Sequence, residues 1–93
     1  MSVKAIAWAV ERHIKPTGAK LLLICLANYA DDKGRCWPSK ARLALDCSAD
    51  KSSVCRWMKV LKDQGLIYVE KRYQSGSQVS SIIHLSLQTW EPN

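Results

Sequence analysis

The apolar residues near the N-terminus follow a helical period. They recur every three or four residues, at Val3, Ile6, Ala7, Val10 and Ile14. This spacing predicts a helix from about Val3 to His13, within residues 2–14, with Ser2 as its N-cap. It assigns the apolar positions to a buried face and leaves Lys4, Trp8, Glu11 and Arg12 on the other. An aromatic ring on a polar face either packs on a neighbouring element or contacts a partner, so Trp8 is a candidate dimer contact.

The next segment is predicted to form the central helix of the domain. Pro16-Thr17-Gly18 breaks the chain, and a helix follows from about Ala19 to Tyr29. This helix is apolar nearly all round, which is typical of a helix at the middle of a domain. Residues 31–34, DDKG, predict a turn. A short extended piece, Arg35-Cys36-Trp37, comes next because Pro38 favours an extended conformation before it.

Residues 39–65 predict two helices joined by a tight connection. Ser39 is the N-cap of a short helix that ends at about Asp46, and Cys47-Ser48-Ala49 connects it to the next helix. Asp50 caps that second helix and Gly65 ends it. Its apolar stripe consists of Val54, Trp57, Met58 and Leu61. The opposite side carries Ser52, Arg56 and Lys59, with Cys55 at the flank.

The period changes to two in the C-terminal part of the chain. Ile67 and Val69 alternate with polar neighbours, as do Ile83, Leu85 and Leu87, which predicts two strands within residues 66–88. Residues 71–78 contain the Gly and Ser of a hairpin loop. The predicted fold is mainly α with a small β-hairpin (α+β). It is a single winged helix-turn-helix domain over residues 1–93, in the order α-α-β-α-α-β-β.

Charge indicates an anionic partner. The chain has 93 residues and a formal net charge of +6, which favours nucleic acid. Eight of its 14 cations lie between Lys33 and Lys62. An α-helix fits the major groove of double-stranded DNA, where base edges present distinct hydrogen-bond patterns. We therefore expect residues 50–64 to form a recognition helix and the hairpin to act as a basic wing.

The predicted contacts comprise base-reading and phosphate-binding side chains. Arg56 could donate two hydrogen bonds to guanine, whereas Lys51 and Lys59 suit phosphate. The full set expected to bind DNA is Ser39, Lys40, Arg42, Lys51, Ser52, Ser53, Cys55, Arg56, Lys59, Lys71 and Arg72. A homodimer is a further expectation, because one module offers few base contacts, and Trp8 and Trp90 are its candidate contacts.

Catalysis is not expected. The four cysteines show no C-x-x-C spacing, the two histidines have no evident catalytic partner in the sequence around them, and no Gly-rich phosphate loop occurs. We therefore expect no metal, no cofactor and no small-molecule ligand. No apolar run is long enough to span a bilayer and the N-terminus is a poor signal peptide. We expect a cytoplasmic prokaryotic protein that is associated with the nucleoid when bound to DNA.

A set of short motifs resembles a known family. They are Asn28-Tyr29-Ala30-Asp31, Trp37-Pro38-Ser39, Leu43-Ala44, Val54-Cys55-Arg56 and the ending Leu61 through Gly65-Leu66-Ile67. Over roughly residues 2–72 the chain is similar to the winged helix-turn-helix module at the N-terminus of bacteriophage and prophage replication proteins. Related plasmid and bacterial regulators share this module. Where the family usually has glycine in the turn, serine or threonine at the cap and arginine early in the helix, this chain has Ser48, Asp50 and Ser52.

The resemblance implies DNA binding at a replication origin. A stand-alone transcriptional regulator, repressor-like and dimeric, is the alternative, since it uses the same fold and contacts. The third hypothesis is a winged helix that serves as a protein-interaction module. Four cations and no acid lie between Lys51 and Lys62, which disfavours that third hypothesis.

Overall fold

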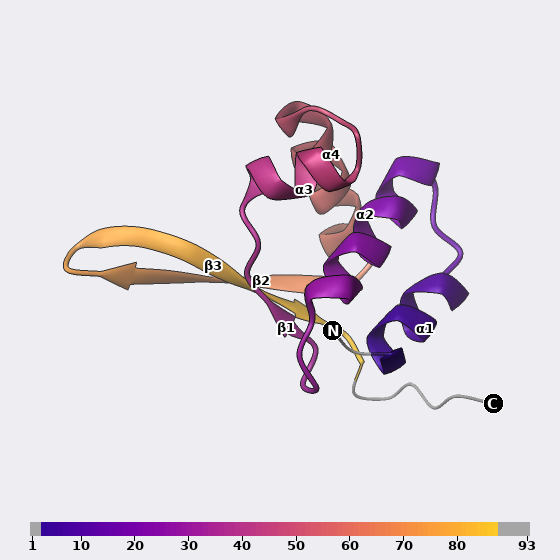
Figure 1. Ribbon diagram of the computed structural model, residues 1–93, viewed down its shortest axis with the longest axis horizontal. Helices are drawn as coiled ribbons and strands as arrows, with labels where there is room; N and C mark the ends of the chain where they lie inside the picture. Colours follow the sequence, from indigo (N-terminus) through magenta and orange to yellow (C-terminus); the bar gives the residue numbers. More distant parts are fainter. Residues whose placement is uncertain (1–2, 88–93) are drawn as a thin grey trace.

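The computed structural model describes residues 3–87, except for the side chains of residues 78–80 (Figure 1). The elements follow in the order α1 (Val3–Glu11), α2 (Thr17–Tyr29), β1 (Arg35–Cys36), α3 (Lys40–Asp46), α4 (Lys51–Asp63), β2 (Ile67–Gln74) and β3 (Ser77–Leu85). The fold is thus α+β, with four helices and a three-stranded antiparallel sheet in these residues. None of the described helices is long and apolar enough to cross a membrane.

Helix α2 lies at the centre of the helical part, as its sequence predicts. It packs against α1, α3 and α4, and Leu22, Leu23 and Leu26 are fully buried. Gly18 permits the contact with α4, because a β-carbon at this position would lie 2.2 Å from the indole of Trp57. The indole of Trp57 therefore sits directly against the first turn of α2.

The buried face of α1 differs from the sequence prediction. Ala5, Trp8 and Ala9 are buried, whereas Val3 is 80% exposed and Val10 is 51% exposed. The prediction of a polar face that carries Trp8 is wrong, because the indole fills the core beside α2. With 2% of its surface exposed, Trp8 cannot serve as a dimer contact without leaving the core. The other candidate, Trp90, lies outside the described residues.

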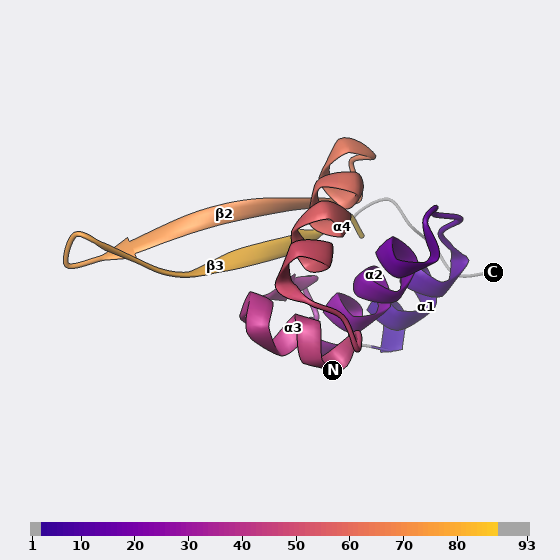
Figure 2. The same cartoon turned by 90° about the horizontal axis from the view of Figure 1, so that it is seen from above.

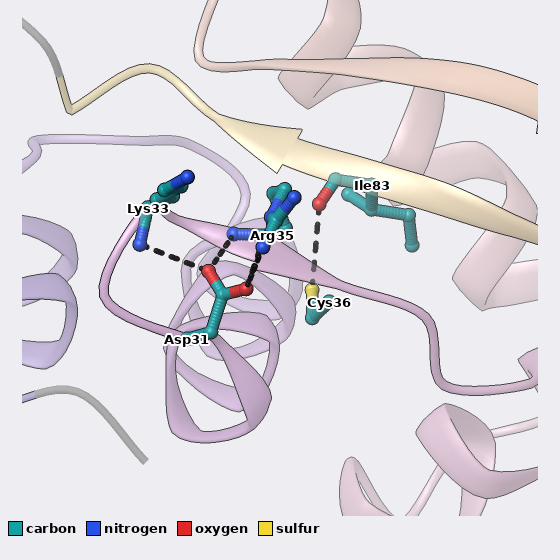
Figure 3. A network of polar contacts seen from close by, with 5 residues as sticks. All are labelled: Asp31, Lys33, Arg35, Cys36 and Ile83. Carbon is teal, nitrogen blue, oxygen red and sulfur yellow. Dashed lines mark hydrogen bonds and ion pairs between the residues drawn. The ribbon is translucent and has the colours of Figure 1, made fainter.

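The turn between α2 and β1 is organised by one carboxylate (Figure 3). Asp31 accepts hydrogen bonds from the backbone N–H of Lys33 at 2.9 Å and of Arg35 at 2.9 Å. It also pairs with the Arg35 guanidinium at 3.0 Å. These bonds, led by that from the backbone N–H of Arg35, hold the pKa of Asp31 below its usual value. The turn thereby positions Cys36, whose thiol lies 3.7 Å from the carbonyl oxygen of Ile83 on β3.

The sheet has the strand order β1-β3-β2, and its long hairpin extends away from the helices (Figures 1 and 2). Ile67, Ile83 and Leu85 anchor the base of the hairpin in the core. The strands continue to a two-residue turn at Ser75-Gly76, where both residues have positive φ (53° and 80°). The predicted loop over residues 71–78 is therefore wrong: Lys71, Arg72 and Tyr73 belong to β2. The distal part of the hairpin lies beyond the core, so neither of its faces is buried. Its sequence therefore lacks the alternation of apolar and polar residues that predicts a strand.

Candidate nucleic-acid interface

The helix pair α3–α4 is held by two side-chain caps and a strained turn. Ser39 Oγ accepts a hydrogen bond from the Arg42 N–H at 3.0 Å, and Asp50 Oδ1 accepts one from the Ser53 N–H at 2.7 Å. Both caps were predicted and both are confirmed. Between the helices Ser48 adopts φ 53°, the left-handed conformation that glycine adopts most easily. The Ala49 N–H then returns to the Ala44 carbonyl at 2.9 Å, which ends α3.

Helix α4 has one buried and one exposed face. Val54, Met58 and Leu61 are buried, in agreement with the predicted apolar stripe, and Trp57 is half-buried. The exposed face carries Ser52, Cys55, Arg56 and Lys59. The helix ends in a Schellman-type motif at Gly65, whose φ is 72°. Its N–H bonds to the Lys62 carbonyl at 3.0 Å, and the Leu66 N–H bonds to the Leu61 carbonyl at 3.0 Å.

The side chains on the exposed face of α4 are only weakly restrained. Arg56 donates a hydrogen bond from Nη2 to Ser53 Oγ at 3.1 Å, which orients the guanidinium along the first half of the helix. Lys59 lies 3.8 Å from Asp63, and the two side chains are 76% and 65% exposed. An ion pair this exposed contributes little to stability, so an anion could displace the carboxylate at small cost. Both cations are therefore available to a ligand.

A groove of about 920 Å³ runs between α4, the N-terminus of α3 and the base of the hairpin. Leu43, Met58 and Ile83 form part of its apolar wall. Four lysines also line it, Lys40 from α3, Lys59 and Lys62 from α4, and Lys71 from β2; Asp63 is the one carboxylate. Three separate elements thus bring ammonium groups to one concave surface, which produces a positive potential suited to a polyanion.

Five of the eleven side chains predicted to bind DNA line this groove. Ser39, Lys40, Cys55, Lys59 and Lys71 line the groove. Lys51, Ser52 and Arg56 are exposed on α4 outside it. Ser53 is half-buried, and its hydroxyl accepts the hydrogen bond from Arg56. Arg72 is half-exposed on β2.

Arg42 lies elsewhere. Its Nε donates a hydrogen bond to the Tyr29 hydroxyl at 2.9 Å and lies 3.4 Å from Asp46 Oδ1. The Tyr29 hydroxyl in turn bonds to the other oxygen of Asp46. This network ties α3 to α2, and Arg42 lines depressions beside α2 rather than the lysine-lined groove.

Lys62 is the one lysine of the groove that the sequence-based prediction of the site does not include. The helical period contains the signal, because Lys62 follows Lys59 by three residues and Cys55 by seven, which places all three on one side of α4. The closeness of Lys62 to Lys71 cannot be found from the sequence, because only the folded hairpin brings β2 alongside α4. From the sequence, Lys62 suits a solvated charge and a phosphate contact equally well, and it is not among the residues predicted to bind DNA.

Cys36 is buried and Cys25 is half-buried, and both thiols stay protonated at neutral pH. Burial raises the pKa of Cys36 to about 12, and partial burial together with the neighbouring thiol of Cys47 raises the pKa of Cys25 to about 12. The Cys25 and Cys47 sulfurs lie 3.7 Å apart, and all four cysteines are free. Within residues 3–87 no group of three or more His, Cys, Asp or Glu side chains could hold a metal ion.

Comparison with known proteins gives one finding. Residues 13–67 match a family described as a helix-turn-helix domain, and the chain belongs to this family. The matched range covers α2, β1, α3 and α4 and ends at the first residue of β2. Neither the curated proteins nor the solved structures include a significant match. The family supports a DNA-binding module, in which α4 is the second helix of the helix-turn-helix.

Proposed function

We propose that this chain binds double-stranded DNA in a sequence-specific way, with α4 as the recognition helix in the major groove. The observation that carries the proposal is the exposed face of α4, where Ser52 and Arg56 lie next to the lysine-lined groove. An arginine in this setting suits a bidentate contact to guanine, and serine hydroxyls suit base edges or phosphate. Lysines around the groove suit phosphates on either side of the bases that are read.

The hairpin acts in this proposal as the wing. Lys71 lines the groove, and β2 continues through Arg72 and Tyr73 to the turn, well beyond the helices (Figure 2). With α4 in the major groove, such a hairpin would lie along the flanking backbone and the adjacent minor groove. It thereby adds phosphate contacts and orients the module on the duplex.

The proposed target is a replication origin. This part of the proposal is supported by the resemblance of residues 2–72 to the module of phage and prophage replication proteins. The second candidate is an operator bound by a transcriptional regulator, since related regulators share the resemblance. Mapping the preferred sequence onto the genome that encodes the chain separates the two. An origin-binding module predicts sites clustered beside a replication gene, whereas a regulator predicts sites over a promoter.

Selection of duplexes from a random pool tests the binding function directly. The winner is compared with a scrambled duplex by fluorescence anisotropy at several salt concentrations. We expect a preference of ~10³-fold or more for the winner, as in specific protein–DNA complexes. Equal binding to both duplexes with a steep salt dependence would leave only a basic surface and contradict the proposal. No binding at low salt would favour the protein-interaction module.

A further inference from the structure

The outer face of α1 is apolar and exposed. Val3 is 80% exposed and Val10 is 51% exposed, and Ile6 and Ala7 between them are half-buried. We call these four residues the α1 stripe. They follow a spacing of three and four residues, so they form one continuous band along the helix. The side of α1 that packs on α2 carries Ala5, Trp8 and Ala9 instead, so Val3 and Val10 face away from the core, whereas Ile6 packs partly against it.

The exposed apolar surface continues from α1 onto α2. Ile6 and Ile24 line the apolar side of a depression of about 310 Å³ between α1, α2 and α3, whose α3 side carries Arg42 and Asp46. Leu21, three residues before Ile24, is 40% exposed. The Lys20 ammonium donates to the Val10 carbonyl at 2.6 Å, which brings this part of α2 to the end of α1. The surface is therefore wider than a single nine-residue helix, which helps it reach the area of a stable interface.

Two charges border the α1 stripe on one flank. With 100° per residue, Lys4 and Glu11 project within about 20° of each other, roughly 100° from the centre of the stripe. Seven residues separate them, so they are too far apart to pair within one helix. Both side chains are exposed, and residues 3–87 provide neither with an ion-pair partner. Opposite charges on the same flank match a second, antiparallel copy of the helix.

We infer that the α1 stripe is the interface of a homodimer in which two α1 helices pack antiparallel across a two-fold axis. A two-fold interface brings the same patch of each subunit together. In this arrangement Val3 faces Val10 of the second copy, and Ile6 faces Ala7. The like flanks of antiparallel helices also meet, so Lys4 approaches Glu11 of the second copy. A parallel pair would bring opposite flanks together and leave both charges without a partner.

The upper limit on the distance between the two α4 helices of this dimer includes the spacing of DNA half-sites. Within each copy α2 packs against both α1 and α4. Five helix-to-helix steps of ~8–10 Å then connect the two α4 helices, which sets an upper limit of ~40–50 Å when the steps are collinear. A bent path is shorter and can approach the ~34–36 Å between half-sites one turn apart. Both views place α1 at the opposite end from the hairpin (Figures 1 and 2), which leaves the hairpin clear of the interface.

The test measures self-association of the full chain without DNA, by sedimentation velocity over a range of protein concentrations. We expect a reversible dimer. The double variant Val3→Gln/Val10→Gln places better helix-forming but polar residues at two exposed positions and should raise the dimer dissociation constant by about tenfold or more. Leu45→Gln is the matched control, because Leu45 is 74% exposed on α3, and it should leave the dimer unchanged.

Charge exchange tests the antiparallel orientation. Lys4→Glu alone and Glu11→Lys alone should each weaken the dimer, whereas Lys4→Glu/Glu11→Lys should restore it. Thermal unfolding of each variant separates loss of the dimer from loss of the fold. A wild-type chain that stays monomeric to ~1 mM, or a dimer unaffected by the Val3→Gln/Val10→Gln variant, would overturn the inference. DNA binding is measured separately, so a monomer that selects its duplex contradicts the dimer and leaves the proposed function intact.

Discussion

Helices α1 and α4 both pack on α2 but present different surfaces to solvent. The outer face of α1 carries Val3 and Val10, whereas the outer face of α4 carries Ser52, Arg56 and Lys59. An apolar band is costly to leave in water and suits a protein partner. A face of hydroxyls and cations is stable in water and suits phosphates and base edges. The same central helix thus supports two faces with different chemistry.

The inner faces of the two helices differ as well. Ala5 and Ala9 let α1 approach α2 closely, and Trp8 between them supplies most of the buried volume. In α4 the buried residues are the medium-sized Val54, Met58 and Leu61. One large side chain thus carries much of the α1 contact, while several smaller ones share the α4 contact. Substitution of the one large buried residue of α1 should therefore lower the stability of the protein more than substitution of any one buried residue of α4.

Trp8→Ala should produce the largest effect. Removal of a fully buried indole leaves a cavity and costs about 3–5 kcal/mol of unfolding free energy. Val10→Ala on the same helix removes an exposed side chain and should change stability by less than ~1 kcal/mol. Urea denaturation at low protein concentration measures both. Similar losses for the two variants would contradict the difference in burial between Trp8 and Val10.

The difference between α1 and α4 also explains what the sequence could predict. In α4 the Asp50 cap, the Gly65 terminus and a polar half define the buried face without knowledge of the rest of the fold. In α1 both faces contain apolar residues, so periodicity alone selects the wider band of Val and Ile. The choice depends on the shape of α2, which accepts two alanines and an indole. That shape is a tertiary property and leaves no signal within α1.

The candidate site likewise combines features that the sequence predicts with features that depend on tertiary contacts. Residues that one helix presents together, such as Ser52, Arg56 and Lys59, are found from the helical period. The groove arises where β2 runs alongside α4, so the contribution of Lys62 depends on the hairpin position. Arg42 appears as a free cation in the sequence, but the fold joins it to Tyr29 and Asp46. Local patterns therefore predict the face, and tertiary contacts decide which cations share it.

On the DNA side, Arg56→Ala should weaken binding to the selected duplex by ~1–3 kcal/mol and relax the preference at one base pair. Arg56→Lys is the matched control, because it keeps the charge and loses the planar fork that suits guanine. It should lose the preference and retain most of the affinity for scrambled DNA. Anisotropy titrations on both duplexes measure the two effects. Unchanged selectivity in both variants would contradict the assignment of α4 as the recognition helix.

Lys59→Ala should have a smaller and uniform effect. A lysine that contacts phosphate contributes equally to every duplex, so its loss lowers affinity for selected and scrambled DNA alike. The slope of log K against log salt concentration should fall by about one. Lys62→Ala should behave in the same way, because Lys62 lines the same groove. A change in selectivity with an unaltered slope would show that these lysines read bases instead.

The smallest effect concerns the cap that begins α4. The hydrogen bond from the backbone N–H of Ser53 holds the pKa of Asp50 below its usual value. The folded state therefore binds this proton more weakly than the unfolded state, whose aspartate titrates near pH ~3.9. The stabilisation is complete above that pH and is lost as the pH falls through the lower pKa of the folded state. Asp50→Asn keeps a capping side chain without a titrating group. Its urea midpoint should match the parent more closely at pH 3 than at pH 7, whereas a constant difference would exclude the carboxylate as the source.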